Sequence, residues 1–338
     1  MRTSIVLRRK INSLARRLGW PWAPARPVKA WISPTTRCNL RCRTCAKFNG
    51  SVTFQDMSPD TYALVRRQIL PGLGEAILTG VGEPFMAPLL PAMLADCERR
   101  GVRVTLTTNG LFWDEALATR LERMGARVVL SVDGADAATM ETVRPGLKFD
   151  LFGENVERFA RLKRQGQNAD FEMFFNVVIL RMNLDQLDAI AEWAARVGAD
   201  CVYFSNFTAA GITDDFAEQS LERHPQIVNP VLDPVVARCQ SLGLKTVRPQ
   251  FLSDAAGETK RAAGGRLLQC PAPWWGVYVE ADGAIFPCCQ WWPPIANIHD
   301  APFRRIWNGR AYRAIRRSVN ALPLPAPCQR CVLGERAF

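Results

Sequence analysis

Hydrophobic and polar positions along the central part of the chain alternate between two patterns, which together predict a parallel α/β fold. Short apolar runs of strand length are each followed by a longer segment in which apolar residues recur at helical spacing. The predicted strands are 28–33, 75–79, 102–108, 127–132, 171–180 and 201–206, and the predicted helices are 58–70, 85–100, 114–124, 149–164 and 184–197. A chain that alternates strands and helices in this way forms a parallel sheet. A polar loop at 208–228, a helix at 229–242 and a strand at 245–248 are expected to follow.

The first 27 residues have the pattern of one basic amphipathic helix. Apolar residues recur at helical spacing among arginines and lysines, and two tryptophans follow; these residues are Leu7, Ile11, Leu14, Leu18, Trp20 and Trp22. Such a helix either covers the base of the fold with its arginines in water, or lies on an anionic membrane surface or a protein partner. Both interpretations stay open at the level of the sequence.

The last part of the chain, from residue 251, is rich in tryptophan, proline and cysteine. A linker is expected at 257–265, and strands at 275–280 and 284–287 flank an Asp-Gly turn, which is typical of a hairpin. A basic helix is expected at 302–319. The patterns therefore predict three parts, namely an N-terminal helix at 1–27, an α/β domain at 28–250 and a small C-terminal hairpin and helix domain at 251–338.

Composition narrows the class of protein and its compartment. The chain has a net charge of +11 and 48% hydrophobic residues, and no apolar run approaches the ~20 residues that span a bilayer. The eleven cysteines include closely spaced groups, and no signal peptide is recognisable. Metal or cluster ligation in a reducing cytoplasm therefore fits better than a disulfide framework, with peripheral membrane association through residues 1–27 as an alternative. We expect no nucleic-acid partner, because no recognised binding module accompanies the charge.

Three cysteines follow the first predicted strand on one short loop: Cys38, Cys42 and Cys45. Three thiolates can ligate three irons of a [4Fe–4S] cluster, which leaves the fourth iron free to bind a small molecule. Zinc would need a fourth protein ligand, and the only histidines, His224 and His299, are not near this loop in the sequence. A disulfide would leave one cysteine over. The loop follows the carboxyl end of a strand, which is where parallel α/β barrels build their active sites.

This spacing, together with the motifs that follow it, resembles the radical S-adenosylmethionine (SAM) superfamily. The chain departs from many members at Thr44, where they carry an aromatic or other bulky apolar residue before the third cysteine. The resemblance implies a partial (β/α)6 barrel of the TIM type, with a [4Fe–4S] cluster whose free iron chelates the amino and carboxylate groups of SAM. It also implies reductive cleavage of SAM to a 5′-deoxyadenosyl radical, with an electron donor such as flavodoxin or ferredoxin.

The turn after the second strand contains Gly80, Gly82, Glu83 and Pro84. Its glycines let a ligand approach the backbone closely, and its proline stiffens the turn. It resembles the family's GGEP motif, in which backbone carbonyls and the glutamate receive the SAM ammonium group. The alternative to SAM binding is that this segment is an ordinary turn between a strand and a helix. Even if the turn binds SAM, Glu83 is expected either to contact it or to fix the conformation of the loop.

The resemblance also assigns residues at the ends of later strands. Ser131 is the first candidate to hydrogen-bond the SAM ribose, with Asp133 second and Asn176 a further candidate. Arg144 is expected either to pair with the SAM carboxylate as a two-pronged donor or to lie on the surface at a helix end. Asn183 is expected to cap the helix that begins at residue 184.

A second cysteine set lies near the C-terminus and consists of Cys270, Cys288, Cys328 and Cys331. Its spacing around Gly283 resembles the SPASM/Twitch extension of radical SAM enzymes, and a set of four resembles the Twitch form, which holds one auxiliary [4Fe–4S] cluster. Four thiolates would fill all four irons, which implies electron transfer or a structural role. A tetrahedral zinc site on the same cysteines is the alternative.

The remaining cysteines have other expected roles. Cys289 adjoins Cys288, and sequence does not tell which of the two is the ligand. Cys289 is either a catalytic hydrogen-atom donor, as a cysteine is in epimerases of the family, or a passive second thiol. Cys97, Cys201 and Cys239 lie in apolar segments and are expected in the core.

The predicted function is that of an enzyme that cleaves SAM and abstracts a hydrogen from an unnamed substrate. If the auxiliary cluster accepts an electron, the net reaction is a two-electron oxidation, such as alcohol to ketone on a sugar or aminocyclitol. Peptide epimerisation or cross-linking is an alternative, although the thirty-odd N-terminal residues are fewer than a leader-binding module needs. An alternative of another class is a non-catalytic iron–sulfur protein that binds a partner or membrane, and the glycine-rich turn after the second strand argues against it.

Overall fold

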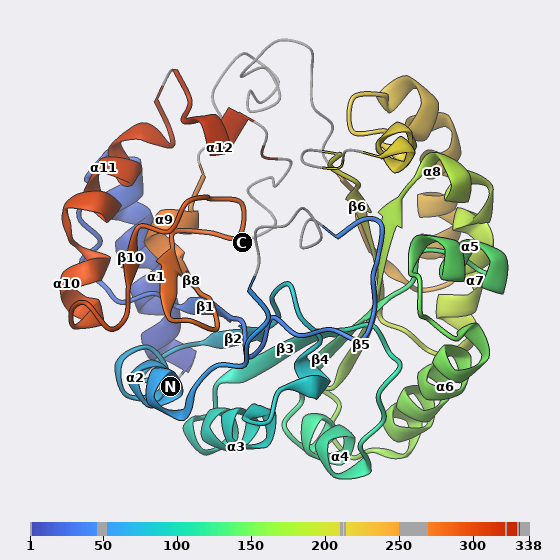
Figure 1. Cartoon of the computed structure of the whole chain (residues 1–338), viewed down its shortest axis with the longest axis horizontal. Coiled ribbons are helices and arrows are strands. Elements are labelled where there is room, and N and C mark those ends of the chain that lie inside the picture. The colour runs from blue at the N-terminus through green and yellow to red at the C-terminus, as the bar shows by residue number, and fades with distance from the viewer. Residues whose placement is uncertain are drawn as a thin grey trace. The chain divides into compact units, whose positions relative to one another are not determined.

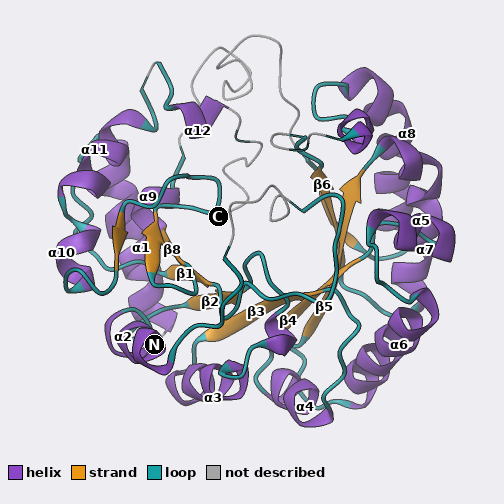
Figure 2. Ribbon diagram, viewed as in Figure 1, coloured by secondary structure: helices purple, strands orange, loops and turns teal. Residues whose placement is uncertain are grey.

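The computed structural model describes residues 2–45, 53–209, 212, 214–249, 270–321, 323–329 and 331. The chain forms two compact units, each with strands and helices (Figure 2). The first comprises Met1–Thr36, Phe54–Val104 and Ser253–Phe338, and the second comprises Arg37–Thr53 and Thr105–Leu252. The predicted linker at 257–265 lies outside the described residues, and the predicted division into three parts stays a prediction.

The sheet of the first unit brings the two ends of the chain together, in the strand order β10-β9-β8-β1-β2. β1 (Lys29–Ile32) pairs in parallel with β2 (Glu75–Leu78) on one side and with β8 (Gly276–Val279) on the other. β9 (Ala284–Phe286) is antiparallel to both β8 and β10 (Ala296–Asn297). The predicted C-terminal hairpin is therefore confirmed, and it continues the sheet that contains the first strand.

The helices of the first unit are α1 (Arg2–Arg17), α2 (Pro59–Gln68), α3 (Leu90–Arg100), α9 (Ala272–Trp275), α10 (Phe303–Trp307), α11 (Arg310–Ser318) and α12 (Ala326–Gln329). The side chain of Ser58 caps α2 by accepting the amide of Thr61. The prediction of one helix at 302–319 is wrong, because the segment forms α10 and α11 with a break at Gly309. A Cβ at Gly309 would lie 2.8 Å from the carbonyl oxygen of Arg305, so the close turn between the two helices requires glycine.

The predicted N-terminal helix is present as α1, but its packed side differs from the one expected. Asn12 and Ala15 are buried, whereas the side chains of the leucine stripe, such as Leu7 and Leu14, are exposed. The helix thus attaches to the first unit through a polar and small-residue side. In the described part of the chain, no helix has the length and apolar character needed to cross a membrane.

The second unit has a parallel sheet in the order β3-β4-β5-β6-β7. These strands are β3 (Arg103–Thr108), whose last four residues belong to this unit, β4 (Arg127–Ser131), β5 (Glu172–Ile179), β6 (Cys201–Asn206) and β7 (Lys245–Val247). Burial alternates strictly along β5, with Phe175 and Val177 fully buried and Phe174 and Asn176 half-buried. One side of the sheet therefore packs against helices, and the other is only partly covered and carries both polar and apolar side chains.

The helices of the second unit are α4 (Glu115–Arg123), α5 (Ala137–Val143), α6 (Phe149–Gln165), α7 (Leu187–Arg196) and α8 (Pro225–Ser241). α6 packs on β5 and α7 on β6 (Figure 1). Trp193 of α7 makes edge-to-face contacts with Phe152 and Phe175, with ring centroids 5.9 and 5.5 Å apart. All six predicted strands and the α/β class with parallel pairing are confirmed, whereas the short α5 was not predicted.

Candidate active site

The loop with the first three cysteines is fastened to the segment that ends α5 in the second unit. The amide of Arg43 donates to the carbonyl oxygen of Val143, the last residue of α5, at 2.9 Å. Leu40 is buried against Gly146, which has a left-handed φ of +95° and where a Cβ would lie 3.4 Å from the leucine side chain. The loop therefore presents three half-buried thiols from one short anchored segment, those of Cys38, Cys42 and Cys45.

Hydrogen-bond donors from separate parts of the unit converge on two of these sulfurs. The amide of Leu40 lies 3.4 Å from Sγ of Cys38, and the side-chain amide of Asn109 lies 3.9 Å from the same sulfur. Nη1 of Arg144 lies 3.7 Å from Sγ of Cys42. Such donors stabilise the negative charge of thiolate ligands and tune the potential of a cluster that they hold. The surroundings of the loop thus fit an iron–sulfur cluster.

The three thiols also affect one another electrostatically. Burial raises the pKa of Cys42 to about 11, Arg144 opposes this rise, and the Cys45 and Cys38 thiols add to it. A cation placed among the three sulfurs would favour their deprotonation, because metal binding displaces thiol protons. Among the described residues, no group of three or more His, Cys, Asp or Glu side chains is close enough together to hold a single metal ion.

Arg144 is held in a buried ion pair, so the interpretation as a surface arginine is wrong. Its Nη2 lies 2.6 Å from Oδ2 of Asp133, and the two side chains are 9% and 0% exposed. Burial lowers the pKa of Arg144, but Asp133 and then Cys42 raise it by more, so the pKa is raised overall. Nε of Arg144 is buried without a hydrogen-bond partner among the described residues. It is a donor that fits an acceptor such as the SAM carboxylate, the role that the resemblance implies.

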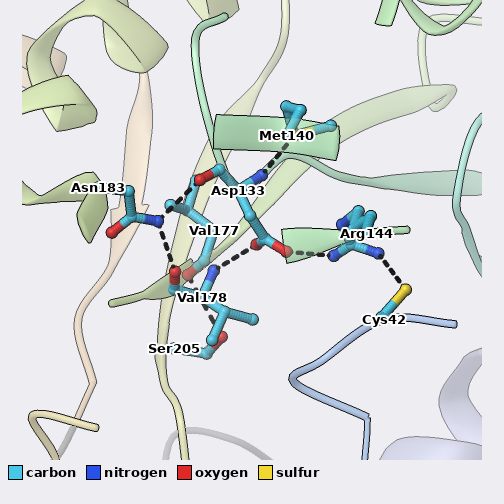
Figure 3. A network of polar contacts seen from close by, with 8 residues as sticks. All are labelled: Cys42, Asp133, Met140, Arg144, Val177, Val178, Asn183 and Ser205. Carbon is cyan, nitrogen blue, oxygen red and sulfur yellow. Dashed lines mark hydrogen bonds and ion pairs between the residues drawn. The ribbon is translucent and has the colours of Figure 1, made fainter. Parts of the chain in front are cut away.

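Figure 3 shows how the carboxylate of Asp133 is positioned. Its Oδ1 accepts the amide of Val178 at 2.9 Å, and Nδ2 of Asn183 donates to the carbonyl oxygens of Asp133 at 2.8 Å and Val178 at 2.9 Å. The prediction that Asn183 caps a helix from residue 184 is wrong, because α7 begins at Leu187. Asn183 lies in a 3₁₀ turn, Arg181–Gln186, and its amide connects β5 to the segment after β4.

Ser131, the last residue of β4, is a neighbour of Asn176, which lies within β5. The two residues are paired in register, and the amide of Val132 donates to the carbonyl oxygen of Asn176 at 2.9 Å. Residues in register on parallel strands point to the same face of the sheet. On β5 this is the half-buried face that also carries Phe174 and Val178. The two candidates therefore lie together where the polar groups of a ribose could be bound, while their contact with SAM stays a prediction.

The glycine-rich turn after β2 is shaped by close packing within the first unit. A Cβ on Gly80 would lie 2.1 Å from Oγ of Ser33, so only glycine fits at this position. Glu83 is buried, and its Oε1 accepts the amide of Phe85 at 3.2 Å, which caps the 3₁₀ turn Pro84–Met86. This bond supports a role for Glu83 in fixing the loop. Binding of the SAM ammonium group by the turn stays a prediction.

A polar cluster that sequence reasoning missed lies at the carboxyl ends of β1 and β8. The hydroxyl of Tyr278 donates to Oε2 of Glu280 at 2.9 Å, and Oε1 of Glu280 accepts the amide of Ala281 at 3.0 Å. The Ser33 hydroxyl lowers the pKa of both side chains, which places it beside them. Burial raises the pKa of Glu280, although these hydrogen bonds oppose the rise. The cluster offers a proton acceptor at strand ends of the kind that form active sites.

The second cysteine set is gathered in the first unit. Oδ1 of Asn320 accepts the amide of Cys270 at 2.7 Å, and Nδ2 of Asn320 donates to its carbonyl oxygen at 3.3 Å. The amide of Cys331 donates to the carbonyl oxygen of Cys328 at 3.3 Å, which closes the CxxC turn. Burial, and then nearby thiols that include Cys270 and Cys331, raise the pKa of Cys288 well above its ordinary value. Cys270, Cys288 and Cys331 are therefore close enough to affect one another electrostatically, whereas ligation of one cluster by all four cysteines stays a prediction.

The adjacent cysteines Cys288 and Cys289 differ in their surroundings. Cys288 is half-buried within electrostatic reach of both Cys270 and Cys331, whereas Cys289 is exposed and within reach of Cys331. This difference favours Cys288 as the ligand. The expected core positions of the three remaining cysteines are confirmed, because all are buried: Cys97, Cys201 and Cys239.

The α/β fold carries two separate cysteine sets, one of three on a single loop and one of four near the C-terminus. This combination is typical of iron–sulfur proteins with two cluster sites. The chain belongs to the radical SAM superfamily: the family model with that description matches residues 32–194, and the SPASM model, an iron–sulfur cluster-binding domain, matches residues 270–332. A radical SAM domain carries a [4Fe–4S] cluster and binds SAM, and a SPASM domain binds auxiliary iron–sulfur clusters. The predicted family, C-terminal domain and cofactors are thus confirmed.

The relatives of the chain include proteins that act on different substrates. It is 26% identical to the AdoMet-dependent heme synthase of Methanosarcina barkeri, over 83% of this chain and 82% of that protein. It is 24% identical to the PqqA peptide cyclase of Gluconobacter oxydans, over 93% and 85%. The fold resembles that of SuiB from Streptococcus suis bound to S-adenosylmethionine, with a TM-score of 0.69, 16% identity and coverage of 91% and 73%.

Proposed function

We propose that the protein is a radical SAM enzyme whose SAM-binding [4Fe–4S] cluster is held by Cys38, Cys42 and Cys45. The observation that carries the proposal is the convergence of donors from Leu40, Asn109 and Arg144 on two of these sulfurs, those of the first and second cysteine. When bound and reduced, the cluster supplies the electron that cleaves SAM to methionine and a 5′-deoxyadenosyl radical. In the cytoplasm, a reduced flavodoxin or ferredoxin would provide that electron.

In this proposal the second unit positions SAM beside the cluster loop. In the second unit, Arg144 would donate to the SAM carboxylate, and Ser131 and Asn176 would hydrogen-bond the ribose diol, with Asp133 orienting Arg144. The SAM-binding function would thus belong to residues 28–250, the auxiliary cluster to 251–338 and a separate role to 1–27.

Release of 5′-deoxyadenosine tests this activity. Anaerobically reconstituted protein, reduced with dithionite and mixed with SAM alone, should release the nucleoside. Cys42→Ala should abolish release because the cluster loses a ligand, whereas the matched control Cys289→Ala should retain it. A wild-type protein with full cluster content and no nucleoside release would favour a non-catalytic iron–sulfur protein.

We further propose that an auxiliary [4Fe–4S] cluster is held by Cys270, Cys288, Cys328 and Cys331. Wild-type protein should then contain about eight irons per chain. Cys42→Ala and Cys328→Ala should each retain about four, and Cys289→Ala should retain about eight. Four irons with one zinc in the wild type would remove the proposed role of this site in electron transfer.

The first candidate reaction is oxidation of an alcohol, such as that of a sugar or aminocyclitol, to a ketone. This reaction removes a hydrogen atom, an electron and the hydroxyl proton. Bound SAM would supply the radical chemistry that removes the hydrogen atom. A cluster held by the four C-terminal cysteines would supply an acceptor for the electron. Glu280 would accept the proton, because Tyr278 and Ser33 hold its carboxylate at the strand ends. Product two mass units lighter than the substrate, formed by wild type but not by Glu280→Gln, would support this assignment.

Peptide modification is the second candidate, and the relatives favour it. One relative is a PqqA peptide cyclase, and SuiB has also been solved bound to its precursor peptide SuiA. Short peptides encoded beside the gene are therefore the first substrates to test. A cross-linked product would lose two hydrogens, whereas an epimerised product would gain one solvent deuterium in D₂O. Loss of epimerisation in Cys289→Ala, with SAM cleavage retained, would assign the hydrogen-atom donor.

A further inference from the structure

The outer side of α1 is an exposed apolar stripe that the fold does not use. Of the ten large hydrophobic side chains exposed in the described part of the chain, seven lie between residues 6 and 22. Four of them follow helical spacing along α1 and the residue after it, whose amide still donates to the carbonyl oxygen of Leu14. Their exposed fractions are 57% for Leu7, 38% for Ile11, 57% for Leu14 and 54% for Leu18. With 3.6 residues per turn, these four side chains project to one side of the helix.

The other side of α1 is already committed to the first unit. Asn12 is fully buried, and its Nδ2 donates to the carbonyl oxygens of Trp274 at 2.7 Å and Ala25 at 3.1 Å. Arg8 donates to the carbonyl oxygen of Gly72 at 2.8 Å. The apolar stripe is therefore held outward, and rotation of the helix to bury it would break these bonds.

The segment after α1 is equally fixed and adds two aromatic side chains. The carbonyl oxygen of Trp20 accepts Nε1 of Trp274 at 3.1 Å, and the carbonyl oxygen of Pro21 accepts Nη1 of Arg316 at 3.2 Å. The side chains of Trp20 and Trp22 are 52% and 51% exposed on this anchored backbone. Tryptophan, with an apolar ring and a polar N–H, is favoured at the boundary between lipid tails and water.

Positive charge borders the stripe. Lys10 and Arg17 are exposed and are seven residues apart, so they line the same edge of the helix. Residues 1–30 contain eight arginines and lysines and no acidic residue. We propose that α1, with Trp20 and Trp22, docks on an anionic lipid surface. The leucines and tryptophans would enter the headgroup boundary, and the basic edge would contact lipid phosphates.

Vesicle binding tests this proposal with the full, cluster-loaded chain. The protein should co-sediment with vesicles of phosphatidylcholine and phosphatidylglycerol but not with phosphatidylcholine alone, and binding should weaken as salt rises. Brominated lipids should quench tryptophan fluorescence in the wild type, and less in Trp20→Phe/Trp22→Phe. Equal binding to both vesicle types, or no binding to either, would overturn the proposal.

Matched variants distinguish vesicle binding through α1 from non-specific binding through other basic or apolar surface residues. Lys10→Glu/Arg17→Glu should weaken vesicle binding by about tenfold or more, whereas Arg304→Glu/Arg305→Glu on α10 should weaken it much less. Leu7→Ser/Leu14→Ser/Leu18→Ser should abolish binding, whereas Leu151→Ser, at another exposed leucine, should not. All variants should retain wild-type 5′-deoxyadenosine release, because none touches the proposed site.

Two other occupants of the stripe would give different results. A second copy of the chain would produce a concentration-dependent dimer in light scattering that the triple leucine variant abolishes, without vesicle binding. A protein partner with an acidic surface would likewise leave vesicle binding absent. Either result would overturn docking on lipid.

Discussion

Arg144 and Asp133 place two opposite charges out of water beside a sulfur that is a proposed cluster ligand. Removal of one partner leaves an uncompensated buried charge, whereas removal of both does not. Arg144→Met is therefore expected to lower the free energy of unfolding by about 3–5 kcal/mol. Asp133→Asn/Arg144→Met should cost less than that single change. Urea unfolding of the cluster-loaded protein under anaerobic conditions measures both.

An exposed ion pair provides the control for this prediction. Arg238 pairs with Glu192 at 2.9 Å, but both side chains are about half exposed. Arg238→Met should therefore cost less than about 1 kcal/mol. If Arg144→Met cost no more than Arg238→Met, the buried pair would not have the structural role that we assign to it.

The three core cysteines give a prediction about pH. Burial raises the pKa of Cys97 to about 12 and those of Cys201 and Cys239 to about 11. Because only the thiolate reacts, at pH 8 about one thiol in a thousand or fewer is reactive at these positions. Iodoacetamide should therefore leave all three unmodified in the native protein, and labelling should increase only as pH rises toward 11. Mass spectrometry after denaturation, which should label them fully, provides the reference.

Residue roles could be predicted from the sequence where the chemistry is local. Cys38, Cys42 and Cys45 belong to one short loop, and their spacing alone suggested that they are ligands of the same cluster. The donor from Arg144 to Cys42 bridges 102 positions, so no spacing could reveal it. The role proposed for Glu280 depends on the pairing of β8 with β1, and this pairing is invisible in a pattern read along the chain.

At the scale of elements, α1 depends on one buried amide. Asparagine has a low intrinsic helix propensity, so Asn12 by itself disfavours the helix. Its side chain, however, accepts the amide of Ala25 at 2.9 Å and donates to the carbonyl oxygens of Ala25 and Trp274. Asn12→Ala should lower the free energy of unfolding by about 1–3 kcal/mol, since buried backbone groups lose their partners. The neighbouring change Ser13→Ala should stay within about 0.5 kcal/mol. Equal effects in chemical denaturation would contradict this assignment.

The hydrophobic pattern predicted which helices and strands exist better than it predicted where the helices begin. Strands were found within about a residue or two, because buried strands in a parallel sheet are short continuous apolar runs. The helices expected at 85 and 184 begin instead at Leu90 and Leu187, after 3₁₀ turns that begin at Pro84 and Arg181. These turns have the apolar spacing of a helix. In each of them, however, a side-chain oxygen accepts a nearby backbone amide: Glu83 accepts that of Phe85, and Asn183 accepts that of Leu180. α5, with seven residues, is too short to establish a period.

At the scale of the whole molecule, the two proposed ligand sets belong to different compact units. Cys38, Cys42 and Cys45 lie in the second unit, and the four C-terminal cysteines lie in the first. The sequence order suggested one barrel followed by a cluster domain. Pairing of β1 with β8 instead makes the C-terminal hairpin part of the sheet that contains the first strand. Loss of each cluster is thus expected to loosen a different set of segments.

Hydrogen–deuterium exchange of single-cluster variants measures this difference. In Cys42→Ala, protection should fall at residues 37–45 and at the end of α5, because the amide of Arg43 is bonded there. In Cys328→Ala, protection should fall at 270–289 and near Asn320, whose side chain holds Cys270. Cys289→Ala should resemble the wild type. If both ligand variants lost protection over the same segments, the two clusters would stabilise one cooperative body, and the assignment of one cluster to each unit would be wrong.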